Sequence, residues 1–182
     1  MNRPRRAAHG ALLRLFRILP RRARVAVVHL LAPEFTVGAI CVLERGDGKV
    51  LLVRHAYRYR WGLPGGLLQR GEEPADAVRR EAMEEVGLEV VTIGEPAVVV
   101  DPTPRRVDVI YRARLAGGQD VDEVPPRSPE ILEARWFGLD ELPELQAETA
   151  GALVALARHA RAWAEQSSWW AGSPVRPTDD GP

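Results

Sequence analysis

The chain has 182 residues, of which 46% are hydrophobic, enough to bury the core of one globular domain with terminal extensions. Its 25 basic and 25 acidic residues give a formal net charge of zero, so no overall basic field favours nucleic acid as a partner. The single cysteine, Cys41, excludes an internal disulfide, fits a reducing cytoplasm and is expected to be a small core residue.

Residues 1–33 form an arginine-rich extension that we expect to be helical. No acidic residue precedes Glu34, whereas arginines occupy positions 3, 5, 6, 14, 17, 21, 22 and 24. An amphipathic helix is predicted by the helical spacing of Leu12, Leu15, Phe16 and Leu19. We expect it to pack on the domain or on a second subunit, which leaves a homodimer open; peripheral attachment to an anionic membrane is the less favoured alternative. No segment approaches the roughly 20 apolar residues of a membrane-spanning helix.

Residues 34–166 have the pattern of one mixed α/β domain. Residues 36–43 are expected to form a strand, and residues 49–54 a second strand returning beside it. The turn Arg45-Gly46-Asp47-Gly48 between them contains Asp-Gly, a strong short-range signal for a hairpin. A β-hairpin is therefore predicted at the start of the domain.

A helix is predicted from residue 73 to residue 86. Pro74 lies near its start and Gly87 just past its end, which is the usual asymmetry of helix termini. Its apolar stripe is expected to comprise Ala75, Val78, Ala82 and Val86. This stripe would face the core and leave another side of the helix for polar groups.

Three acidic residues lie together on that helix. They stand at i, i+3 and i+4, so their side chains converge within about one turn: Glu81, Glu84 and Glu85. Neighbouring carboxylates repel and raise one another's proton affinity, and a divalent cation that prefers oxygen ligands would relieve this. The spacing therefore predicts a magnesium site.

The segment from Gly66 to Leu88 resembles the sequence motif of the Nudix hydrolases. Its fixed positions are all filled, by Gly66, Glu72, Arg80, Glu81, Glu84, Glu85 and Gly87. Ala82 stands where the family usually has a larger aliphatic residue, and the preceding run from Trp61 to Gly66 is also similar to the family. The resemblance implies an α/β/α sandwich with a mixed β-sheet and hydrolysis that depends on Mg²⁺, with Mn²⁺ as a substitute.

The resemblance also implies roles for individual residues. Glu84 and Glu85 would be the principal metal ligands, Glu81 would share coordination or hold the attacking water, and the carbonyl oxygen of Gly65 would be a further ligand. Arg80 would pair with Glu72 and stabilise the loop and helix. For the general base, two later residues compete with Glu81: Glu130, at the end of a loop, and Glu133, at the start of a strand.

The remaining elements are predicted as strands at 88–93, 97–100, 107–115 and 132–137, with a closing helix at 149–165. A Gly-, Asp- and Pro-rich segment at 117–129 is expected to be a mobile loop, and residues 167–182 a disordered tail. Substrate contacts are expected from cationic and aromatic residues beside the motif: Arg54, His55, Tyr57, Arg58, Tyr59, Arg60 and Trp61. Arg105 and Arg106 are comparable candidates on another loop, and core packing is the simpler role for a lone aromatic residue.

The function predicted on this basis is cytoplasmic hydrolysis, by water, of a diphosphate bond in a nucleoside diphosphate linked to another group. Nucleotide sugars, nucleoside triphosphates and dinucleotides all fit that description. A non-catalytic nucleotide-sensing module is the alternative, although such a module has no need for a costly carboxylate cluster. Isomerisation of a prenyl diphosphate is a third option, and it lacks an evident catalytic cysteine because Cys41 lies in a strand-like run.

Overall fold

The computed structural model describes residues 16–32, 34–103, 105–117 and 121–171, which belong to two compact units, 1–35 and 36–182. In the first unit, helix α2 spans Arg21–Leu31 and exposes Val25, Val28 and Leu30. The amphipathic helix expected around Leu12 lies mostly outside the described residues. None of the described helices is long and apolar enough to span a membrane.

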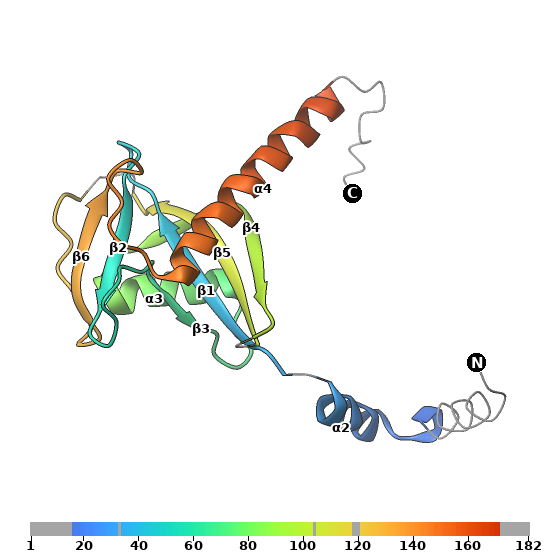
Figure 1. The fold of residues 1–182 in the computed structure, drawn as a ribbon. Coiled ribbons are helices and arrows are strands. Elements are labelled where there is room, and N and C mark those ends of the chain that lie inside the picture. The colour runs from blue at the N-terminus through green and yellow to red at the C-terminus, as the bar shows by residue number, and fades with distance from the viewer. Residues whose placement is uncertain (1–15, 33, 104, 118–120, 172–182) are drawn as a thin grey trace. The chain divides into compact units, whose positions relative to one another are not determined.

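The second unit is built on a mixed sheet with strand order β3-β1-β5-β4 (Figure 1). The central strand β1, Thr36–Leu43, runs parallel to β5, Arg106–Leu115, and antiparallel to the short β3, Gly65–Leu67. At the far edge, β4, Val90–Asp101, pairs antiparallel with β5. Two further strands, β2 at Val50–His55 and β6 at Ile131–Phe137, form a separate antiparallel pair.

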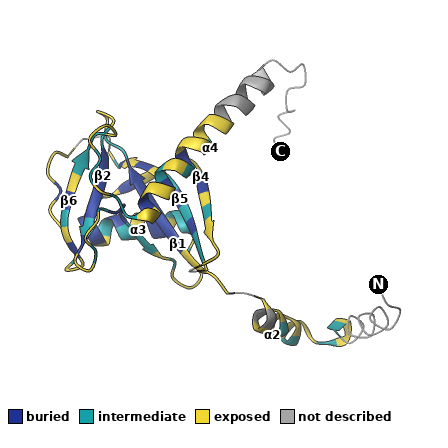
Figure 2. Ribbon diagram, viewed as in Figure 1, coloured by how far each residue is buried: buried dark blue, intermediate teal, exposed yellow. Residues whose placement is uncertain are grey.

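Two helices complete the unit, α3 at Pro74–Val86 and α4 at Ala147–Ala171. Because side chains alternate along a strand, β1 contributes to two cores. One core contains Ala39, Cys41 and Leu43 together with Ala77, Val78 and Ala82 of α3. The other contains Ile40 and Val42 together with Ala152 and Leu156 of α4. The centre of the sheet is thus buried on both faces (Figure 2), which confirms the predicted α/β/α sandwich.

The predicted hairpin is wrong in its pairing, although both strands and the turn are present. After the turn, β1 and β2 share only the isolated bridge between Glu44 and Val50, and β2 pairs with β6. β2 nevertheless packs into both cores. Leu51 and Val53 lie in the α3 core, while Val50 and Leu52 lie in the α4 core. Both edges of β1 are already paired, with β3 and with β5, so β2 pairs with β6 instead.

Three other elements differ from expectation. β4 is continuous across the predicted break at 94–96, with an irregularity between Ile93 and Ala97. The closing helix α4 begins at Ala147 and runs into the expected tail as far as Ala171; residues 172–182 lie outside the described part. β3 was not predicted, because its three residues at Gly65–Leu67 are too few to show a period. The expected loop at 117–129 has no helix or strand in its described residues, and its mobility stays a prediction.

Helix α3 begins and ends as predicted, and this fixes the acidic residues in space. Pro74 occupies the first turn after the N-cap Glu73, and Gly87 ends the helix in the left-handed region at φ 69°. The backbone N–H of Arg127 caps the carbonyl oxygen of Glu85 at 2.9 Å, which ties the later loop to the helix end. Cys41 lies fully buried beneath this helix, as expected, and burial followed by the charge of Glu85 raises the pKa of its thiol to about 12.

Candidate active site

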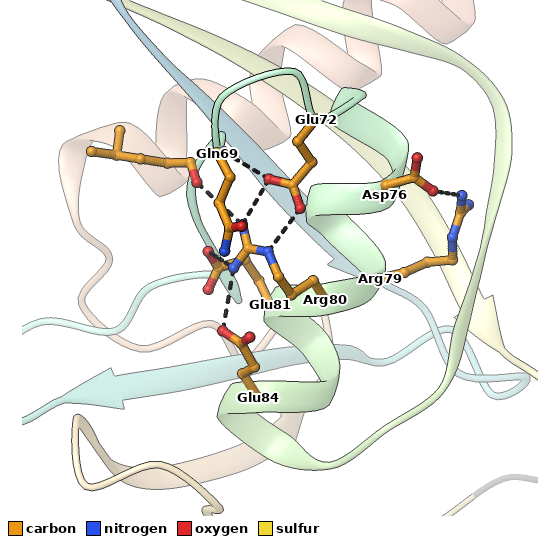
Figure 3. Close-up of polar contacts among 8 residues, drawn as sticks. Gln69, Glu72, Asp76, Arg79, Arg80, Glu81 and Glu84 are labelled. Atoms are coloured by element: carbon orange, nitrogen blue, oxygen red, sulfur yellow. Dashed lines mark hydrogen bonds and ion pairs between the residues drawn. The ribbon is translucent and has the colours of Figure 1, made fainter.

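The guanidinium of Arg80 lies at the centre of the acidic cluster (Figure 3). Its Nε and Nη2 atoms donate to the two carboxylate oxygens of Glu72 at 2.8 and 3.0 Å, so the predicted pair is present and bidentate. Its Nη1 atom donates to Glu81 at 2.7 Å and to Glu84 at 3.2 Å. A further bond at 3.2 Å to the carbonyl oxygen of Leu67 joins α3 to β3. One cation therefore holds three carboxylates and the adjacent strand together.

The pairing with Arg80 changes the acidity of Glu72. The hydrogen bond from Arg80, followed by one from the backbone N–H of Gln69, lowers the pKa of Glu72 from 4.5 to about 2. A carboxyl group with a lowered folded-state pKa stabilises the fold above its unfolded-state pKa, and this stabilisation is lost as the pH falls through the folded-state value.

We therefore expect Glu72→Gln to lower the melting temperature at pH 7, with a deficit that shrinks as the pH falls from about 4.5 towards about 2. Thermal unfolding followed by circular dichroism across this range measures the deficit. Glu73→Gln, at an exposed neighbouring position, is the control and should show little dependence of this kind. A deficit in Glu72→Gln that stays constant with pH would contradict the assigned pair.

Glu81 lies against the glycine turn that precedes the helix. A methyl group at Gly66 would overlap the carboxylate of Glu81, so glycine leaves the space this side chain occupies. Burial, the largest effect, raises the pKa of Glu81, and the charges of Glu85 and Glu84 act in the same direction against the opposing effect of Arg80. A carboxylate with raised proton affinity, held in a turn of backbone, is suited to accept a proton.

Glu85 is buried on the other side of the same turn, with only 7% of the residue exposed. One of its carboxylate oxygens accepts from the backbone N–H of Gly65 at 3.2 Å. The other lies 3.5 Å from Nε2 of His55, which is itself buried and whose Nδ1 atom has no hydrogen-bond partner in the described residues. His55, predicted as a substrate-binding residue, is therefore placed directly beside the acidic cluster.

The oxygens around the turn suit a hard divalent cation, because carboxylates and carbonyls are the ligands that Mg²⁺ prefers. Within the described ranges, no three His, Cys, Asp or Glu side chains already surround a common metal position. The contacts explain this: Arg80 holds Glu81 and Glu84, while Gly65 holds Glu85. Glu84 is 57% exposed at its side chain and has one bond to Arg80, so it can exchange that partner for a cation. The donor set therefore fits the predicted ion.

A cavity of about 100 Å³ opens beside the Gly65–Gly66 turn. Its apolar wall is formed by Ile40, Leu63 and Leu67, and its charged wall by Arg58, Arg106 and Glu148. His55 also lines it, so the cavity and the acidic cluster share one boundary. The contribution of α4 was not predicted: Gln146 immediately precedes this helix, and Glu148 lies in its first turn. An acidic residue in the first turn of a closing helix is a common feature and gave no functional signal.

Three of the predicted substrate-binding residues are engaged away from this cavity. Arg54 donates to Glu133 at 3.0 and 3.2 Å across the β2–β6 pair. Arg60 forms an exposed ion pair with Glu144 at 3.4 Å. The ring of Trp61 packs edge-on against Phe137 at 4.9 Å, which is the core-packing role that the sequence left open. The cavity thus includes His55 and Arg58 but not these three residues, whose role in binding stays a prediction.

The two later candidates for the general base have different surroundings. Glu133 is held by Arg54 and also pairs with Arg135, so its carboxylate already has two cationic partners. Glu130 is exposed, and its carboxylate has no hydrogen bond or ion pair in the part of the chain that the structure describes. Its backbone carbonyl accepts from Ala56 at 2.8 Å, next to His55. Of the two, Glu130 is the one free to move towards the cluster.

Comparison with known proteins gives a consistent result. Residues 34–158 match the family described as NUDIX domain. A MutT-like protein of Streptomyces ambofaciens is 34% identical over 116 residues, which cover 64% of this chain and 72% of that protein. An NAD-capped RNA hydrolase NudC of Pseudomonas syringae pv. tomato is 34% identical over 120 residues, but this chain spans only 41% of its length. A crystal structure of a Nudix hydrolase from Nitrosomonas europaea superposes with a TM-score of 0.58 at 30% identity, covering 66% of this chain and 69% of that one.

Proposed function

The chain belongs to the Nudix hydrolase family, and we propose from this premise that it hydrolyses a diphosphate bond in a nucleoside diphosphate linked to another group. The observation that carries the proposal is the packing of two carboxylates against one glycine turn, Glu81 at Gly66 and Glu85 at Gly65. This arrangement gathers negative charge at the mouth of a cavity that also contains arginine side chains. Cation binding at the turn and an anionic substrate in the cavity would neutralise both sets of charges.

The principal metal ligands in this proposal are the carboxylates of Glu84 and Glu85 and the carbonyl oxygen of Gly65, while Glu81 either shares the coordination or holds the attacking water. A bound Mg²⁺ would neutralise the diphosphate and make a bound water more acidic. In the reaction, a water oxygen forms a new bond to phosphorus, and the bond from phosphorus to the bridging oxygen breaks. The bridging oxygen leaves with the electron pair as part of a phosphate group, and a carboxylate base takes the proton of the water.

Glu81 is the base that the surroundings favour. Its raised proton affinity suits proton transfer, and it lies against the turn where the metal would bind. Glu130 is the second candidate, because its exposed carboxylate lies on a loop whose backbone is joined to Ala56. Arg80 has a positioning role, since it holds Glu72, Glu81 and Glu84 at once.

The proposal is tested with purified protein and Mg²⁺ against nucleoside triphosphates, nucleotide sugars and dinucleotides. We expect at least one class to be cleaved within the diphosphate, and in H₂¹⁸O the label should appear on a phosphate product. Chromatography and mass spectrometry identify the products. Tight binding of a panel member without turnover of any would overturn the proposal and favour the nucleotide-sensing alternative.

A further inference from the structure

The cavity beside the glycine turn is lined by two guanidinium groups, each of which is fixed by hydrogen bonds to neighbouring side chains. Nη1 of Arg58 donates to Gln146 at 2.9 Å and to Glu148 at 3.1 Å. Nε of Arg106 donates to the nearly buried carboxylate of Asp108 at 2.7 Å. In the described residues these bonds use one nitrogen of each guanidinium, which leaves two nitrogens of each to donate to a ligand.

The Arg106–Asp108 pair is built into the sheet. Both residues lie on β5 and pack against Gly38 of the neighbouring β1, where a methyl group would overlap the Asp108 carboxylate and lie 2.8 Å from Nη2 of Arg106. Glycine at this position leaves room for the ion pair. Arg106 is therefore fixed at the cavity wall rather than extended into solvent.

Glu148 adds a negative charge to the same cavity wall, where it pairs with Arg58 at 3.1 Å. Its own backbone N–H first, and then the hydrogen bond from Arg58 and the charges of Arg58 and Arg106, lower the pKa of its carboxyl group against the effect of burial. Its side chain is 44% exposed, so it can turn out towards solvent. This carboxylate thus lines the cavity beside Arg58, where its negative charge would compete with an anionic ligand.

The size and place of the cavity restrict that ligand. A volume of about 100 Å³ suits a compact group rather than a whole nucleotide. The same cavity is bounded by Gly65 and Gly66, against which the catalytic carboxylates pack. A compact anion bound there would be connected closely to the scissile diphosphate.

We propose that this cavity binds a phosphate group of the substrate outside the scissile diphosphate, that Arg58 and Arg106 hold it, and that the negative charge of Glu148 competes with it. The inference rests on the proposed hydrolysis and narrows its substrate class to compounds with a third phosphate. That phosphate can be the end of a triphosphate chain or a monoester on a ribose. Nucleotide sugars with only two phosphates lack it.

The test uses two matched pairs of compounds, NADPH with NADH and ATP with ADP-glucose. We expect kcat/KM to be about tenfold or more higher for the member with the third phosphate, the effect of one charge-assisted hydrogen bond. Arg58→Gln and Arg106→Gln should each raise KM for that member about tenfold and change KM for its partner less than about twofold. Glu148→Gln should lower KM for the three-phosphate member several-fold, because the competing charge is removed.

Controls separate this inference from the proposed hydrolysis. Glu141→Gln removes an exposed carboxylate from the segment before α4 that does not line the cavity, and it should keep wild-type kinetics. The conservative variant Arg106→Lys, together with the melting temperatures of all variants, identifies any loss of activity that is caused by unfolding. The inference is overturned if wild type turns over both members of each pair equally and the kinetics do not change in Arg58→Gln and Glu148→Gln. That result would still support the proposed hydrolysis. Calorimetric binding of the same pairs to Glu85→Gln measures the preference for the third phosphate without turnover. If this preference is found but wild type hydrolyses none of the compounds, the proposed function alone is overturned. If the preference is absent, the inference is overturned.

Discussion

Replacing Glu85 with glutamine is expected to lower kcat by about 10²–10³-fold with little change in stability. Glutamine has nearly the same shape, and its amide oxygen can still accept from the backbone N–H of Gly65, as the carboxylate does at 3.2 Å. The negative charge that would bind the cation is lost. Steady-state kinetics with Mg²⁺ and the best substrate of the panel measure the effect, and calorimetric titration with Mn²⁺ measures cation binding.

A carboxylate on the same helix supplies the matched control for that prediction. Asp76 is exposed at the first turn of α3, where it pairs with Arg79 on the surface. Asp76→Asn removes one negative charge from the helix without touching the glycine turn, so it should retain kcat and Mn²⁺ binding. Removal of divalent ions with a chelator should abolish the hydrolytic activity of both wild type and Asp76→Asn, and added Mg²⁺ should restore it. Wild-type kcat in Glu85→Gln would show that this residue does not bind the ion.

The acidic cluster could be predicted from the sequence because its geometry is local. Helix spacing brings Glu81, Glu84 and Glu85 to one side of α3, and Arg80 reaches Glu72 only eight residues away. Pro74 and Gly87 fix the ends of that helix by backbone preferences that do not depend on the rest of the fold. The helix and its acidic cluster therefore follow from residue type and spacing, whereas the pair of Arg80 with Glu72 was implied by the resemblance to the Nudix motif.

The other wall of the site depends on contacts between distant segments. Glu148 reaches Arg58 across 90 positions, and Arg54 reaches Glu133 across 79. The sequence shows a charged residue in each place but not its partner, so Arg54 and Arg58 looked alike as candidates. The pairing of β2 with β6 gives them different surroundings, because it places Arg54 opposite Glu133. That pairing was itself missed, since a strong turn signal predicts a hairpin but not which strand a buried segment joins.

The two adjacent glycines of the turn are expected to fail in different ways when each is changed to alanine. In Gly66→Ala the new methyl group meets the end of the Glu81 side chain, which is flexible and can move aside. The fold should persist while the carboxylate shifts by about 1 Å, a misplacement that costs about 10² in kcat. In Gly65→Ala the methyl group meets the carbonyl oxygen of Ala39 in the backbone of β1, and the residue already has a φ of +149°.

Because the strand backbone has no room to move, Gly65→Ala should instead destabilise the fold by about 1–3 kcal/mol. Thermal unfolding and kcat, measured on both variants and wild type, separate the two effects. We expect Gly66→Ala to keep the wild-type melting temperature and lose activity, and Gly65→Ala to melt at a lower temperature. A Gly66→Ala variant with full activity would mean that the position of Glu81 against the turn does not matter for catalysis, and Glu130 would then be the stronger candidate for the base.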